Sequence, residues 1–164
     1  MADLFVPGTI SELEAVYALI DARISWMDDV GIQQWNVTNY WECYPKAYYE
    51  TAAAEGRLYV LKCEGIVVGA VVLREQDKRW NDHRSAFYIH NLVTAIGTKG
   101  AGEAILKACF DLAAARKKSR LRLDCSISNK KLNAYYEKQG FTFAGTCADG
   151  AYQGNLREKV VLTD

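Results

Sequence analysis

The positions of apolar and polar residues divide this chain into segments with two different periodicities. Residues 86–94 form an apolar run that is typical of a buried strand, whereas residues 103–115 place apolar side chains three and four positions apart. Gly97, Gly100 and Gly102 lie between the two segments. The pattern therefore predicts a strand, a glycine-rich loop and a helix, in that order.

Similar patterns predict the remaining elements. Thr9 or Ser11 offers a cap for a long helix that ends before Gly31, and Pro45 suits the start of a second, shorter helix. Glu64-Gly65 marks the turn of a hairpin. Strands are expected at 3–6, 57–63, 66–73, 120–125, 141–148 and 156–162, and short helices at 46–55 and 129–140.

These elements predict a fold of the α/β (α+β) class in a single domain, residues 1–164. We expect a central, mostly antiparallel sheet of six to seven strands, flanked by about four helices. A chain of 164 residues is long enough to bury most of its apolar surface, and no repeat or low-complexity stretch suggests a second domain.

Charge and composition narrow the possible partners. The formal net charge is zero, so no global field favours nucleic acid or an anionic membrane, and neither is expected as a partner. No apolar run is long enough to span a membrane, and the first seven residues lack the features of a signal peptide, so we expect a cytoplasmic protein. Five widely spaced cysteines and two histidines show no ligand spacing, so no metal is expected.

The glycine loop carries the clearest chemical signal. The first turn of a helix has unpaired N–H groups and a partial positive charge, both of which attract phosphate. Gly100 and Gly102 let an anion approach the main chain and can take positive φ, while Lys99 adds a charge. Residues 97–103 are therefore predicted to hold a pyrophosphate group. The alternative is that these glycines only make a turn.

A second motif follows the next predicted strand. Residues 129–141 follow the pattern Asn-x-x-Leu-x-x-Tyr-Tyr-x-x-x-Gly-Phe, with Asn129, Tyr136, Gly140 and Phe141 in place. Together with the Gly-x-Gly loop, this resembles the acetyl-CoA-binding half of the GNAT superfamily of N-acetyltransferases. Gly97 departs from the family loop, which has Arg or Gln there, and the departure removes one side-chain donor.

The resemblance implies a GNAT-like fold, acetyl-CoA as acyl donor and a set of residues that bind it. The pantetheine arm would follow the strand at its end, and the pyrophosphate would rest on the loop. Asn129, which can also cap its helix, would contact the cofactor. The full implied set is Leu92, Val93, Thr94, Lys99, Gly100, Ala101, Gly102, Glu103 and Asn129.

Two catalytic residues are candidates. Tyr136 matches the family tyrosine that protonates the departing sulfur, and a phenol is protonated at neutral pH. Its neighbour Tyr135 is expected to pack in the core, because adjacent helix residues point in different directions. His90 lies on the strand that would face the thioester, and an imidazole, with an ordinary pKa near about 6.5, suits proton removal. The alternative base is a water chain, with His90 as a structural residue.

The acceptor is predicted only as a class: a primary amine on a small molecule or a peptide. Trp26 and Trp35, from an aromatic-rich segment, and Tyr88, beside His90 on the strand face, are candidates to line its site. The tryptophans alternatively cap the core. A homodimer is possible.

Two other functions stay open at this point. A non-catalytic domain that binds or senses acyl-CoA would keep the pyrophosphate site at residues 97–103 but would have lost turnover. A Rossmann-type oxidoreductase would use Gly100 and Gly102, with Asp124 about 20 residues later. Ile105 stands where that motif needs its third glycine, and the hairpin upstream also argues against it.

Overall fold

The structure, a computed structural model, describes residues 3–163 and divides into two compact units. The first unit combines Met1–Leu73 with Asn91–Leu106, and the second combines Arg74–His90 with Lys107–Asp164. Strand β4 (Ala86–Thr94) and helix α4 (Ala101–Ala115) each contribute to both units. The expectation of a single domain stays a prediction.

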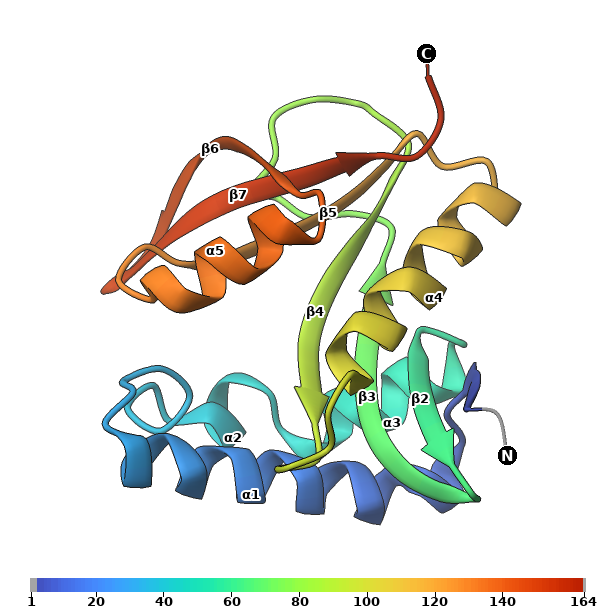
Figure 1. The fold of residues 1–164 in the computed structure, drawn as a ribbon, viewed down its shortest axis with the longest axis vertical. Coiled ribbons are helices and arrows are strands. Elements are labelled where there is room, and N and C mark those ends of the chain that lie inside the picture. Colours follow the sequence, from blue (N-terminus) through green and yellow to red (C-terminus); the bar gives the residue numbers. More distant parts are fainter. Residues whose placement is uncertain (1–2, 164) are drawn as a thin grey trace. The chain divides into compact units, whose positions relative to one another are not determined.

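The first unit contains antiparallel strands, the helices α1, α2 and α3, and a short 3-10 helix, η1 (Figure 1). Val60 of β2 pairs with Val6 of β1 on one side and with Ala70 of β3 on the other. The predicted hairpin turn is confirmed, with positive φ at both Glu64 and Gly65. The elements are β1 (Leu4–Pro7), η1 (Ile10–Glu12), α1 (Leu13–Val30), α2 (Tyr40–Cys43), α3 (Lys46–Ala54), β2 (Leu58–Cys63) and β3 (Ile66–Arg74).

Local signals explain where α1 begins and ends. The Glu12 carboxylate accepts a hydrogen bond from the Thr9 amide at 2.8 Å, which satisfies a donor at the start of the helical segment. At the other end, Gly31 takes a left-handed conformation with φ of 75° and caps the helix. The end agrees with the sequence-based expectation. At the start, Thr9 is the N-cap of η1, and α1 follows directly from Leu13 without a side-chain cap of its own.

The core of the first unit is apolar and rich in aromatic rings. Helices α1 and α3 pack on β2 and β3 through fully buried residues such as Val16, Ala52 and Val72. On the opposite face of β3, a Cβ at Gly69 would lie 2.5 Å from Cδ1 of Ile105. Glycine at this position therefore lets the start of α4 pack closely on the strand.

The second unit is built on β4, β5, β6 and β7. Ala86 and Phe87 of β4 pair in parallel with Arg120 and Leu121 of β5. Strand β7 is antiparallel to both β5 and β6, and α5 packs on β5 and β6. The elements are β5 (Arg120–Ser126), α5 (Lys130–Lys138), β6 (Thr142–Asp149) and β7 (Tyr152–Val160).

The strand order of the seven-stranded sheet is β1-β2-β3-β4-β5-β7-β6, which confirms the predicted fold class. Two details of the prediction were wrong. The last strand starts at Tyr152 and not at residue 156, because Gly150-Ala151 forms a two-residue turn and Asp149 pairs directly with Tyr152. The single-turn helix α2 also lies inside the aromatic segment, where residue spacing gave no helical signal.

Candidate active site

The glycine loop before α4 has the conformation that its sequence allows. Gly97 and Gly100 both have φ of 80°, and a Cβ added to either would meet nothing within 4 Å. The backbone conformation, and not tight packing, therefore requires glycine at these two positions. Gly102 differs, because it lies in the first turn of α4 without positive φ.

The loop offers free donors for an anion. Within residues 3–163, the amides of Lys99 and Gly100 donate no hydrogen bond to the protein. The first N–H groups of α4 are unpaired by helix geometry, beginning at Ala101. Lys99 is exposed beside them, and so is Glu103, whose carboxylate opposes a bound anion. The donors and the open space above Gly100 fit a pyrophosphate group.

The end of β4 is irregular where the pantetheine arm was expected. Asn91 has φ of 55°, which a non-glycine residue adopts only with strain. Its side chain compensates, because Oδ1 accepts from the Tyr48 hydroxyl at 2.7 Å and Nδ2 donates to the Tyr40 hydroxyl at 2.9 Å. The strand prediction missed this feature, although Asn is the non-glycine type that best tolerates positive φ.

The three residues expected at this end of β4 differ in their surroundings. Val93 is buried in the core of the first unit, while Leu92 and Thr94 are half-buried. Arg23 of α1 donates to the Thr94 carbonyl at 2.8 Å and to its hydroxyl at 3.1 Å. Thr94 is therefore held by α1.

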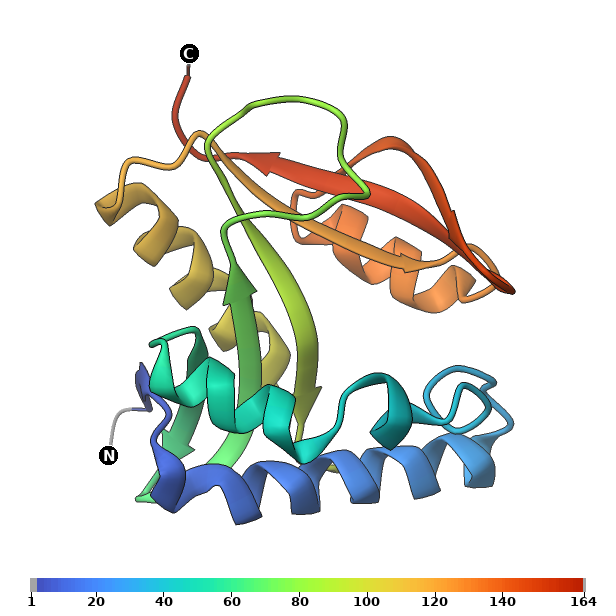
Figure 2. The same ribbon diagram turned by 180° about the vertical axis from the view of Figure 1, so that it is seen from behind.

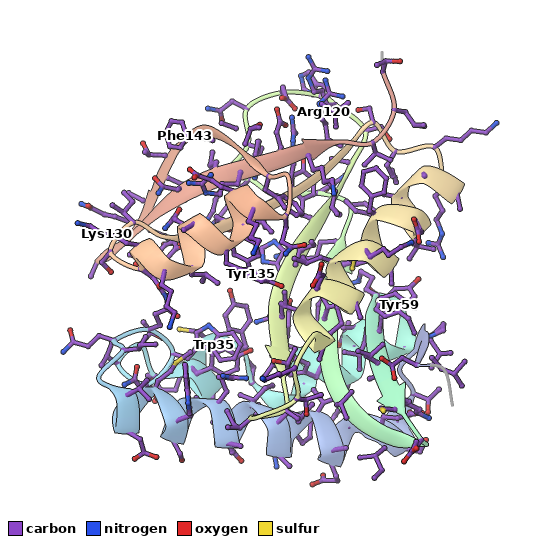
Figure 3. All side chains as sticks on the ribbon, in the orientation of Figure 1. Trp35, Tyr59, Arg120, Lys130, Tyr135 and Phe143 are labelled. Carbon is purple, nitrogen blue, oxygen red and sulfur yellow. The ribbon has the colours of Figure 1, made fainter. Side chains whose placement is uncertain are left out.

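The predicted acceptor residues lie in different surroundings. Trp26 is half-buried on α1 with the guanidinium carbon of Arg23 at 4.7 Å from its ring centroid. Trp35, labelled in Figure 3, packs against Tyr40 with 4.7 Å between ring centroids. Tyr88 belongs to the second unit, where it is buried and its hydroxyl accepts from Arg122 at 3.2 Å.

Tyr136 lies on the buried side of α5. It is 8% exposed and packs edge-on against Phe141. Burial raises the pKa of its phenol, so the hydroxyl stays protonated at neutral pH. Within the described part of the chain, the hydroxyl makes no hydrogen bond to another protein group.

The expected division between the two tyrosines was wrong for burial. Tyr135, labelled in Figure 3, is only half-buried, whereas Tyr136 is the core residue. The reason is the helical stripe shared by Asn133 and Tyr136, three positions apart, which faces the sheet. A buried ring with a free hydroxyl still suits the role predicted for Tyr136.

The orientation of α5 depends on polar contacts, of which the sequence signalled only one. Asn129 caps the helix as predicted, accepting from the Leu132 amide at 3.0 Å. Asn133 Oδ1 accepts from Arg157 Nε at 3.0 Å and from Asn155 at 2.9 Å. Arg157 is itself buried and also reaches Glu137 of α5. No periodic pattern marks such pairs, because they join residues about 20 positions apart.

His90 is also partnered. Its Nε2 lies 2.9 Å from Asp77 Oδ2, and both side chains are buried. Asp77 stands in the polar loop 75–85, where the sequence singled out no residue. The structure therefore adds a buried carboxylate to the predicted histidine.

Three further observations on residues 3–163 concern membrane spans, metal sites and surface hollows. No helix in this range is both long and apolar enough to cross a membrane. Within the same residues, no three His, Cys, Asp or Glu side chains gather to hold a metal ion. A shallow hollow of about 410 Å³ beside β6 and β7 is lined by Ile127, Thr146, Cys147, Ala148 and Gln153, none of them a predicted site residue.

Comparison with known proteins agrees with these observations. Residues 19–141 match the model of the acetyltransferase (GNAT) family. An uncharacterized N-acetyltransferase, YesJ of Bacillus subtilis, is 23% identical, and the match covers 96% of this chain and 90% of the relative.

Solved structures show the same fold. A GNAT-family acetyltransferase from Listeria monocytogenes has a TM-score of 0.80 at 21% identity, covering 96% of this chain and 94% of the other. The PaiA N-acetyltransferase of Thermoplasma acidophilum, in complex with coenzyme A, has a TM-score of 0.75 at 18% identity, covering 98% and 99%. The family match excludes the dinucleotide oxidoreductase alternative. Because the family model matches residues 19–141, which are most of the chain, the chain belongs to the GNAT acetyltransferase family and is an acetyl-CoA-dependent acyltransferase.

Proposed function

We propose that this protein transfers the acetyl group of acetyl-CoA directly to a primary amine of a small molecule or a peptide. Acetyl-CoA supplies an activated thioester. Residues Lys99 to Glu103 hold its pyrophosphate, Leu92 to Thr94 line its pantetheine arm, and Asn129 contributes from α5. Orientation of the two substrates supplies much of the acceleration, worth about 7–11 kcal/mol in well-aligned systems.

The observation that carries this proposal is the glycine loop. Among residues 3–163, the amides of Lys99 and Gly100 find no acceptor, and the space above Gly100 is open. A helix N-terminus with free donors and an adjacent lysine is well suited to a doubly charged pyrophosphate.

Two proton transfers accompany the reaction. The amine nitrogen forms a bond to the acetyl carbon, and the bond from that carbon to sulfur breaks. His90 accepts the proton that the amine loses, and Tyr136 donates a proton to the departing sulfur. The buried, unpaired hydroxyl of Tyr136 supports its role as general acid.

The nature of the acceptor is the coarsest part of the proposal. The names of the relatives YesJ and PaiA, both N-acetyltransferases, support an amine. Trp26 and Trp35 are half-buried and retain ring surface for such a substrate. Tyr88 is the weakest of the three candidates, because its hydroxyl already bonds Arg122. A homodimer and a cytoplasmic location stay predictions.

Calorimetry with coenzyme A tests the proposed pyrophosphate site at Lys99 to Glu103, called the cradle below. Gly100→Ala is expected to weaken coenzyme A binding at least tenfold, because the added Cβ strains the loop and intrudes on the anion. Gly97→Ala is the matched control, with the same φ of 80° and the same open surroundings. Equal effects of the two substitutions would show that backbone strain alone is responsible and would contradict a cradle centred on Gly100.

Measurement of turnover tests the proposed role of Tyr136 as general acid. With acetyl-CoA and a panel of amines, Tyr136→Phe is expected to lower kcat about 100-fold, the lower end of general acid catalysis, with unchanged coenzyme A affinity. Tyr135→Phe, one residue away and less buried, is expected to retain turnover. Full activity of the Tyr136 variant would remove this residue from the mechanism.

A further inference from the structure

The loop 75–85 is fastened to the second unit although it contains no helix or strand. Arg122 of β5 donates to both carboxylate oxygens of Asp82, at 2.8 and 2.7 Å. The same guanidinium lies 4.2 Å from the ring centroid of Trp80 and 2.9 Å from Glu158 of β7. Figure 2 shows the loop, in green, in front of β5 and β7. The loop is therefore a fixed part of this unit.

The loop places one carboxylate against His90. Asp77 Oδ2 lies 2.9 Å from His90 Nε2, while Oδ1 accepts from the Arg79 amide at 2.9 Å. The side chains are only 5% and 7% exposed. Burial raises the pKa of Asp77, but the hydrogen bonds from His90 and Arg79 outweigh it, so the pKa lies below its ordinary value. Asp77 is thus an ionised, immobile acceptor.

This contact determines which nitrogen of His90 carries the proton. An ionised carboxylate only accepts hydrogen bonds, so Nε2 must donate to Asp77. In the neutral ring the lone pair is then on Nδ1. No residue between 3 and 163 makes a hydrogen bond to Nδ1, so this nitrogen is free to accept a proton from a substrate.

We propose that Asp77 is a positioning residue, which holds His90 in the Nε2–H tautomer and stabilises the imidazolium formed when Nδ1 accepts the amine proton. This inference rests on the proposed role of His90 as general base. The proton released by the amine stays on Nδ1 until solvent removes it, so the step needs no other reactant.

The other charged groups in this part of the unit are already paired with one another. Asp124 of β5 accepts from the Tyr152 hydroxyl of β7 at 2.5 Å and faces Arg79 at 3.9 Å. Arg79 also bonds Asp149 of β6 at 3.2 Å. On the same strand, burial raises the pKa of the Cys147 thiol, which keeps it neutral. Asp77 is therefore the carboxylate committed to His90.

Histidine NMR tests the tautomer without any substrate. The chain has only two histidines, His83 and His90, so ¹⁵N-labelled imidazole signals are assigned with one variant, His83→Gln. In the wild type, the neutral ring of His90 is expected to carry its proton on Nε2 alone. Asp77→Asn is expected to lose this preference, because an amide can also donate to the ring. A mixed tautomer in the wild type would overturn the proposal.

The pH dependence of turnover tests the catalytic consequence. Asp77→Asn is expected to lower kcat about 10–100-fold and to move the acid limb of the profile to lower pH, with KM for acetyl-CoA nearly unchanged. Glu75→Gln removes a carboxylate of the same loop, one that pairs with Lys118 and touches neither His90 nor Arg122, and its profile is expected to match the wild type in shape. If both variants give the same profile, Asp77 is only structural.

A double variant separates action through His90 from any other effect. In a His90→Gln background, Asp77→Asn is expected to cost no further kcat, because the group that it positions is gone. An additional loss would overturn the proposal. Failure of the wild type to acetylate any amine would instead contradict the proposed function, and the NMR result would still decide the position of the proton.

Discussion

The two units bury their polar groups in different ways. In the first, the buried polar groups are neutral: the hydroxyls of Tyr40 and Tyr49 bond each other, and Asn91 donates to Tyr40. In the second, some of them are charged: Arg122 and Arg157 are buried and meet carboxylates at 2.9 and 3.1 Å. The groups named here are all paired, but the two kinds of pairing differ in what the loss of a partner costs.

The difference matters for stability, because neutral and charged buried groups respond differently when a partner is lost. Neutral hydrogen bonds add about 1 kcal/mol each and depend little on salt. A buried guanidinium that loses its carboxylate is more costly, since the remaining charge has no solvent around it. We therefore expect the second unit to be more sensitive to removal of a single polar partner.

The largest effect is expected at the Arg122 cluster. Asp82→Ala should lower the free energy of unfolding by about 3 kcal/mol, because the buried guanidinium keeps only Glu158 as a carboxylate partner. Urea denaturation followed by circular dichroism measures the change. Asp111→Ala breaks the exposed pair with Lys107 and should cost less than about 0.5 kcal/mol. Similar losses in both variants would remove the contrast between buried and exposed pairs.

A smaller effect is expected in the aromatic network. Tyr40→Phe should cost about 2 kcal/mol, because it leaves Asn91 and the Tyr49 hydroxyl without their shared partner. Tyr17→Phe is the control in the same cluster, since its hydroxyl makes one long bond of 3.3 Å to the Lys46 carbonyl. If Tyr40→Phe costs more than Asp82→Ala under the same urea protocol, the ranking of the two units is reversed.

Two substitutions at Asn91 separate the cost of its backbone strain from the cost of its lost hydrogen bonds. Asn91→Ala and Asn91→Gly both lose the bonds to Tyr40 and Tyr48, but only alanine meets the steric penalty at φ of 55°. The alanine variant should therefore be less stable by about 1 kcal/mol. Equal stabilities in thermal melts would mean that the backbone relaxes at this position.

The smallest effect is expected in how the stability of the protein depends on acidic pH. The hydrogen bond from Arg122 lowers the pKa of Asp82 from 3.8 to about 2. A lowered folded-state pKa stabilises the protein above about pH 4, and this stability is lost as the pH falls towards 2. Asp82→Ala should lose less stability than the wild type over this range in melting experiments. This effect should be smaller than the cost of Asp82→Ala, because a protonated Asp82 still accepts a hydrogen bond from Arg122 and solvent screens its partly exposed carboxyl group.

The first unit has its own acid-sensitive group. Glu12 also has a pKa lowered to about 2, through hydrogen bonds from Thr9 and Lys62. Glu12→Gln should therefore also flatten the stability profile between about pH 4 and 2. An unchanged profile would indicate that the acid response belongs to the second unit alone.

The elements were largely predictable from the sequence, because they depend on local periodicity and on caps. Thr9, Gly31, the Glu64-Gly65 turn and the Asn129 cap act within a few residues. The glycine loop was predictable for the same reason. By contrast, the partners Asp82 and Arg122 are 40 positions apart, and only the folded chain brings them together.

The candidate site was predictable only in part. Asp77 lies in a polar loop without periodicity, so nothing in the sequence distinguished it from the other charged residues around it. The irregularity at Asn91 was missed because the strand pattern continues through it. The burial of Tyr136 rather than Tyr135 followed from the helical stripe that α5 turns to the sheet, which depends on how Asn133 and Arg157 seat the helix.

Side chains along β4 alternate between the two faces of the sheet, so the number of residues in this strand matters as much as their types. Tyr88 pairs with Arg122 across the parallel ladder, and His90, two residues on, points to the same face. Loss or gain of one residue in this strand would turn Phe87 and Ile89 towards Arg122 and Asp77 and leave both charges facing hydrocarbon. Related genes are therefore expected to tolerate substitutions in β4 far more readily than insertions or deletions.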